Sequence, residues 1–76
     1  MTVFATITLP NGAVISSIDI DGEQDVTAFR NMFRQGVRGD THSISFQKRD
    51  VTGMSTMVTI PYQLLKMSLI EITEVQ

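Results

Sequence analysis

The chain has 76 residues, 42% of them hydrophobic, and its eight acidic and six basic groups give a formal net charge of −2. This composition argues against intrinsic disorder, and the charge provides no global field that would attract nucleic acid. With no cysteine and one histidine, disulfides and thiolate metal sites are excluded. We expect one domain over residues 1–76 that gains stability from packing or self-association. We place it in the cytoplasm because no secretion signal or membrane-spanning apolar run is evident.

The first segments predict a β-hairpin. Residues 2–9 alternate between apolar and polar side chains, as in a half-buried strand, and residues 13–20 continue the alternation. Asn11 and Gly12 lie between the two runs, and Asn-Gly in this position is the strongest short signal for a hairpin turn.

One segment, residues 24–35, has a clear helical period. Val26, Phe29 and Phe33 form its apolar stripe, and polar and basic side chains lie on the opposite side. Gly36 suits the left-handed position that follows many helices, so we expect the helix to end there. The apolar stripe of such a helix must be buried against other elements, and the flanking strands can form that surface.

The second half of the chain predicts three more strands. Residues 41–48 and 54–60 alternate, and Pro61 ends the second run and suits the first turn of a short helix over residues 62–67. Residues 68–75 form the last strand. The order is strand, strand, helix, strand, strand, short helix, strand. The predicted class is therefore α+β, with a small five-stranded sheet and one long helix packed on one face.

This order resembles the β-grasp fold of ubiquitin-like proteins, which also have a similar length. The resemblance covers the whole chain and rests on element order. It implies that the first and last strands lie side by side and parallel at the centre of the sheet. Conjugating members of that family end in Gly-Gly, whereas this chain ends in Glu74-Val75-Gln76, so a covalent modifier is not predicted. The alternative is an antiparallel five-stranded sheet with one helix, in which the last strand pairs elsewhere.

The acidic residues before the helix have a spacing that suggests a calcium loop at first sight. An EF-hand loop needs glycine at position 6 and a bidentate glutamate at position 12. Here Gly22 falls at position 4 and Arg30 at position 12, so the match fails. We therefore expect no metal site and assign these carboxylates to the strand end and the helix N-terminus: Asp19, Asp21, Glu23 and Asp25.

His42 is the only side chain suited to acid–base catalysis near neutral pH. It shares its phase with Ile44 and Phe46, so we expect it to point inward as a partly buried structural residue. No ordered nucleophile motif and no glycine-rich phosphate loop accompanies it. We therefore predict that the protein is not an enzyme and binds no cofactor.

Two groups of basic residues are candidates for charged contacts. Arg30, Arg34 and Arg38 can form a ridge along the helix, and Lys48 and Arg49 form a second cluster. Nucleic-acid binders usually add a strong basic excess or aromatic side chains on which bases stack. We therefore disfavour nucleic acid as the partner, and keep a nucleic-acid-associated regulator as an alternative function.

The sheet face away from the helix carries apolar side chains from four strands. If these side chains are contiguous, they form the kind of patch that commonly marks a protein-binding or self-association site. We therefore predict a protein interface at these five positions: Phe4, Ile15, Met57, Leu69 and Val75.

The predicted function is a small non-enzymatic protein-interaction module that binds a protein partner or forms a homo-oligomer through this face. A phage-type accessory protein that binds or inhibits a host protein is one form of this hypothesis, although no motif identifies it. A small structural subunit of a larger assembly is a further alternative.

Overall fold

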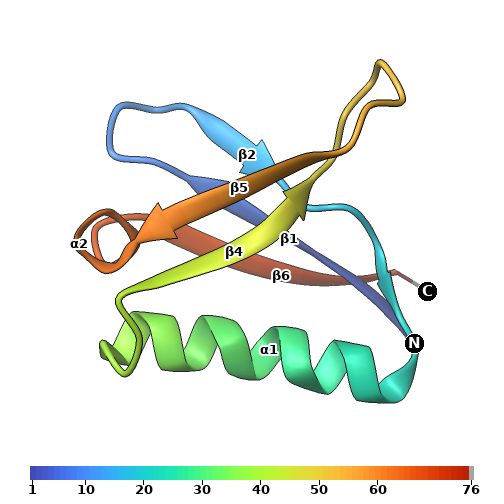
Figure 1. The fold of residues 1–76 in the computed structure, drawn as a ribbon, viewed down its shortest axis with the longest axis horizontal. Helices are drawn as coiled ribbons and strands as arrows, with labels where there is room; N and C mark the ends of the chain where they lie inside the picture. Colours follow the sequence, from blue (N-terminus) through green and yellow to red (C-terminus); the bar gives the residue numbers. More distant parts are fainter. Residues whose placement is uncertain (76) are drawn as a thin grey trace.

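The computed structural model describes residues 1–75 and confirms the α+β class, with a long helix packed on small antiparallel sheets (Figure 1). In chain order the elements are β1 (Thr2–Thr8), β2 (Val14–Ser16), β3 (Ile20–Asp21), α1 (Glu23–Arg38), β4 (Ser43–Lys48), β5 (Thr56–Pro61), α2 (Tyr62–Leu65) and β6 (Leu69–Val75). No helix within the described range is long and apolar enough to cross a membrane.

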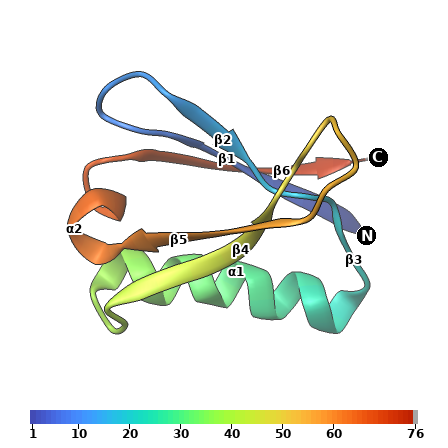
Figure 2. The same ribbon diagram turned by 45° about the horizontal axis from the view of Figure 1, so that its top comes forward.

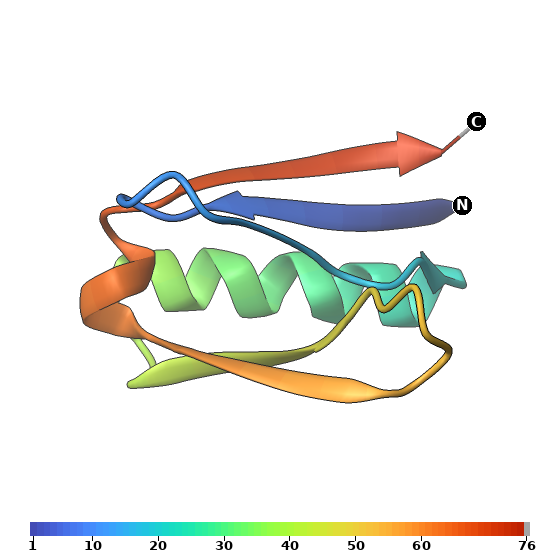
Figure 3. The ribbon, with the colours of Figure 1, turned by 90° about the horizontal axis from the view of Figure 1, so that it is seen from above.

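β1 is the central strand of the larger sheet. It pairs antiparallel with β2 and β3 along one side and with β6 along the other. β4 and β5 form a second, two-stranded antiparallel sheet. Seen from above, β1 and β6 run along one side of α1, and β4 and β5 run along the other (Figure 3). The described chain thus has six strands in two sheets, where the sequence predicted five strands in one.

The core lies between α1 and the two sheets. It combines the apolar stripe of α1 with the inward side chains of β1, β4 and β5, and α2 closes one end through Leu65. The fully or nearly fully buried apolar residues are Val3, Ala5, Ile7, Val26, Phe29, Phe33, Ile44, Phe46, Ile60 and Leu65.

The pairing of the first and last strands corrects the expected arrangement. Thr2 lies opposite Val75 and Thr8 lies opposite Leu69, so β1 and β6 are antiparallel, and the start of β1 and the end of β6 share one end of the molecule (Figure 2). The β-grasp arrangement requires this pair to be parallel and is therefore not confirmed. The cause is that α2 leads the chain into β6 beside the end of β1, from where β6 runs back along β1.

A β-bulge divides the predicted second strand into β2 and β3. Ser16 lies opposite Thr6 and Ile20 lies opposite Val3, so the three residues 17–19 face two residues of β1. At the bulge, Ser17 forms an isolated bridge to Lys48 of β4. The bulge is therefore the point where the two sheets are joined.

The long helix is confirmed, but it continues past the predicted end. Gly39, not Gly36, takes the left-handed conformation that ends α1, with φ of 81°. Gly36 is buried within the helix, where an added Cβ would lie 2.6 Å from Cγ2 of Ile44 and 2.8 Å from Cδ2 of Leu65. Gly36 therefore allows α1 to approach β4 and α2 closely.

Candidate protein-binding site

The bulge changes which side chains of β2 face the core. Ile15 lies opposite the fully buried Ile7 and packs against the core, so its predicted place on the outer face is wrong. Val14, opposite Thr8, is the exposed apolar residue of β2 instead. The extra residue at the bulge shifts the alternation, and so Ile15 and Ile20 both pair with buried residues of β1 although their positions differ by an odd number.

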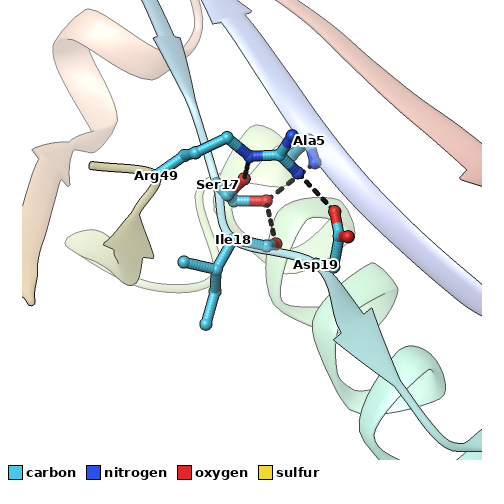
Figure 4. Close-up of polar contacts among 5 residues, drawn as sticks. All are labelled: Ala5, Ser17, Ile18, Asp19 and Arg49. Atoms are coloured by element: carbon cyan, nitrogen blue, oxygen red, sulfur yellow. Dashed lines mark hydrogen bonds and ion pairs between the residues drawn. The ribbon is translucent and has the colours of Figure 1, made fainter. Parts of the chain in front are cut away.

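Phe4 does face outward, but Arg49 covers its ring. The guanidinium carbon of Arg49 lies 4.9 Å from the ring centroid, close enough for a cation–π contact. The same guanidinium donates to the carbonyl oxygen of Ser17 at 3.2 Å and forms an ion pair with Asp19 (Figure 4). The ring of Phe4 is therefore covered by a contact within the chain and is mostly buried.

The remaining three predicted interface residues are exposed but separated. Met57, Leu69 and Val75 have exposed fractions of 67%, 60% and 47%. Leu69 and Val75 lie at opposite ends of β6, and Met57 belongs to the other sheet. The outward positions of β1 between these residues are mostly threonines: Thr2, Thr6 and Thr8. The structure does not bring the five predicted residues together into one patch.

The three helix arginines, in contrast, meet at one site. Arg30, Arg34 and Arg38 recur every four residues, so they follow one side of α1 with a rise of about 6 Å between neighbours. They line a groove of about 630 Å³ between α1 and β6. The other residues that line this groove are Phe33, Val37, Ile70, Ile72 and Glu74.

The groove carries an excess of positive charge. It contains three arginines and one glutamate, on a chain whose formal net charge is −2. Glu74 pairs with Arg30 at 2.7 Å, and Arg38 lies 3.9 Å from Asp40. Arg34 forms no ion pair within residues 1–75, and Nε of Arg30 is buried there without a hydrogen-bond partner. The basic side of α1 is thus only partly neutralised by the chain itself.

The floor of the groove is apolar. Phe33 belongs to the core, and Ile70 and Ile72 of β6 pack against it while remaining partly exposed. Val37, on the rim, is 47% exposed. The groove therefore offers partly open apolar surface next to a row of arginines that the chain neutralises only in part.

β6 is also an edge strand. All seven of its residues pair with β1, and in the part of the chain that the structure describes it pairs with no other strand. An edge strand presents unpaired N–H and C=O groups, which make it a template for a further strand. The groove therefore lies directly beside available backbone.

The opposite flank of α1 meets β3 and is acidic. Asp19, Asp21 and Asp25 line a smaller groove of about 410 Å³ there. The hydroxyl of Thr2 donates to Asp21 at 2.9 Å and the N–H of Gly22 donates at 3.0 Å, and these two hydrogen bonds lower the pKa of the Asp21 carboxyl. No group of three or more His, Asp or Glu side chains that could hold a metal ion is found among residues 1–75.

The other singled-out residues lie away from the arginine-lined groove. His42 is exposed just before β4, so its predicted inward orientation is wrong; its carbonyl accepts a hydrogen bond from the Tyr62 N–H at 2.8 Å. The inward alternation of Ile44 and Phe46 begins only within β4 itself. Lys48 lies at the end of β4, next to Arg49 in the chain, and does not extend the arginine row of α1.

Comparison of the chain with protein-family models, with curated proteins and with solved structures finds no match.

Proposed function

We propose that the protein is a small non-enzymatic protein-interaction module that binds its partner in the groove between α1 and β6. One observation carries the proposal. The groove combines a partly open apolar floor, a row of three arginines and the unpaired edge of a strand.

Each of these features supplies one component of protein recognition. Apolar floor residues give affinity through burial, an edge strand gives main-chain hydrogen bonds, and arginines give orientation through charge. The two more specific hypotheses, an accessory protein that binds a host protein and a subunit of a larger assembly, both require such a surface.

The alignment of Arg30, Arg34 and Arg38 favours one second candidate, a nucleic-acid-associated regulator. Two observations weigh against it. Glu74 of β6 pairs with Arg30 at one end of the arginine row, and Arg49 forms an ion pair with Asp19 on a different surface. Binding to nucleic acid that weakens steeply with salt would support this second candidate.

A selection from a random peptide library tests the proposed function. The immobilised protein is compared with Val37→Asp, which places a charge in the groove, and with Met57→Asp, which makes the same kind of change on the outer sheet face. We expect enriched peptides that bind the wild type and the Met57→Asp variant but not the Val37→Asp variant. Loss of binding in the Met57→Asp variant alone would place the site on the outer face and contradict the proposal.

A further inference from the structure

We infer that the partner is an acidic, extended segment of another protein, which adds to the free edge of β6 as a further strand. The inference rests on the proposed function and names the chemistry of the partner for the same groove.

The edge of β6 determines the shape of the partner. β1 pairs with β6 along its whole length, from Leu69 to Val75. In such a strand, alternate residues direct their N–H and C=O groups to the free side. An extended segment of similar length can pair with these groups, and its alternate side chains then point inward over Ile70 and Ile72.

The spacing of the arginines fits an added strand. Neighbouring arginines in the row are separated by about 6 Å along the axis of α1. Side chains on one face of a strand repeat every 6.6 Å or so, since each residue rises by about 3.3 Å. Successive inward side chains of an added strand would therefore come close to successive arginines. Glu74 is an example within the chain of a strand carboxylate that reaches a helix arginine, because it lies on β6 and pairs with Arg30 at 2.7 Å.

The charges determine the sequence pattern. Arg30 is already paired with Glu74, so a carboxylate added at that end would also meet Glu74. Arg34 has no ion-pair partner among residues 1–75, and Arg38 has only a long contact to Asp40. We therefore assign one apolar and two acidic inward positions to the partner, with the two carboxylates beside Arg34 and Arg38.

A second copy of this chain fits the groove less well. Its β6 would bring Ile70, Ile72 and Glu74 inward, which supplies one carboxylate instead of two. It would also bring a second arginine row toward the first, and like charges placed together disfavour association. The excess of positive charge therefore favours an acidic partner over self-pairing.

The binding of a labelled peptide, Val-Ile-Thr-Glu-Thr-Glu-Val, tests the inference by fluorescence anisotropy at low and high salt. Paired antiparallel to β6, it places isoleucine beside Glu74 and its two glutamates beside Arg34 and Arg38. One control peptide replaces both glutamates with glutamine, and another carries N-methyl groups on alternate backbone nitrogens. The groove variant is Arg34→Glu, and its matched control is Lys48→Glu, which changes the net charge equally away from the groove.

We expect the glutamate peptide to bind the wild type and Lys48→Glu equally, and Arg34→Glu about tenfold more weakly or worse. Binding should weaken as salt rises, and methylation in the phase that removes the edge-facing N–H donors should abolish it. Equal affinity of the glutamate and glutamine peptides for the wild type would overturn the inference.

Two further outcomes separate this inference from the proposed function. If library-selected peptides bind the groove without acidic residues, the proposed function stands and the acidic strand is wrong. If light scattering across a dilution series shows a dimer that Arg34→Glu or Val37→Asp dissociates, a second copy fills the groove and the inferred occupant is wrong.

Discussion

The two flanks of α1 differ in how the sheet meets them. On the β3 flank, Ser17 and Arg49 tie the bulge to β1 and β4, and the Asp21 carboxylate is held by Thr2 and Gly22. On the β6 flank the helix arginines face the free edge of a seven-residue strand, whereas β3 has only two residues. Both flanks carry a groove, but on the acidic flank Asp19 and Asp21 are engaged by contacts within the chain, whereas the basic flank keeps apolar side chains, Arg34 and the backbone edge of β6 available. Residues that stabilise the fold and residues that bind a partner should therefore separate between the flanks.

Replacement of Ser17 by alanine should have the largest effect. The Ser17 side chain is fully buried, accepts a hydrogen bond from the Ala5 N–H at 2.9 Å and donates to the Ile18 carbonyl at 2.9 Å. Its removal leaves a buried donor unsatisfied, which costs about 1–3 kcal/mol of unfolding free energy, measured by urea denaturation. Ser45→Ala, which removes an exposed hydrogen bond to Thr59, is the control. Equal losses of unfolding free energy in both variants would show that the Ser17 hydrogen bonds do not stabilise the bulge.

Replacement of Gly36 by alanine should have the next largest effect. The added methyl would overlap Ile44 and Leu65, which costs about 1–3 kcal/mol, and the better helix propensity of alanine returns up to about 1 kcal/mol. The net result is a loss of roughly 1 kcal/mol. Thr27→Ala, on the exposed side of α1, should change stability by less than about 0.5 kcal/mol. A Gly36→Ala variant as stable as the wild type would mean that α1 lies farther from β4. The position of α1 beside β6, and with it the arginine-lined groove, would then differ as well.

Replacement of Arg49 by alanine should lower stability more than replacement of Arg34, so this pair of variants compares the two flanks directly. The side chain packs on Phe4 and pairs with Asp19, but it is 47% exposed, so solvent screens the pair. We expect a loss of roughly 0.5–1 kcal/mol in urea denaturation. Arg34→Ala, on the open flank, should be close to neutral because Arg34 has no ion pair within the described residues. A larger loss for Arg34→Ala than for Arg49→Ala would reverse the comparison.

Replacement of Asp21 by asparagine should have the smallest effect, a change in how stability depends on pH in the acidic range. Hydrogen bonds from Thr2 and then Gly22 hold the pKa of Asp21 below its ordinary value of 3.8, so the charged carboxylate is favoured in the folded state. Its contribution is therefore present above the pKa of the unfolded chain and is lost as pH falls through the lower folded pKa. Urea midpoints of wild type and Asp21→Asn should differ most near neutral pH and converge below about pH 4. A difference that grows toward acid would have the wrong sign.

Much of the fold could be predicted because its signals are local. The stripe of Val26, Phe29 and Phe33 and the Asn-Gly turn each lie within one segment, and the structure has α1 and the β1–β2 pairing where they predict them. The bulge could not be predicted, because it depends on the Ser17 hydroxyl replacing a backbone acceptor for Ala5. The inward turn of Ile15 follows from that bulge.

The candidate site could be predicted only in part. The four-residue spacing of Arg30, Arg34 and Arg38 is visible in the sequence and indicates a row on one side of a helix. Which strand lies beside that row depends on the antiparallel return of β6 along β1, a long-range pairing without a local signal. The outer-face prediction failed to find Arg49 above Phe4 for the same reason.

The most direct measurement is amide hydrogen exchange in the free protein, followed residue by residue by NMR at several protein concentrations. The amides of Ala5 and Ser17, which are bonded to each other's residue across the bulge, and of Ile18, which is bonded to Gln47 of β4, should exchange slowly. Alternate amides of β6 should exchange fast at every concentration, because its outer edge is open. Uniform protection along β6, or protection that rises with concentration, would show that another chain segment covers this edge and would contradict an open binding groove.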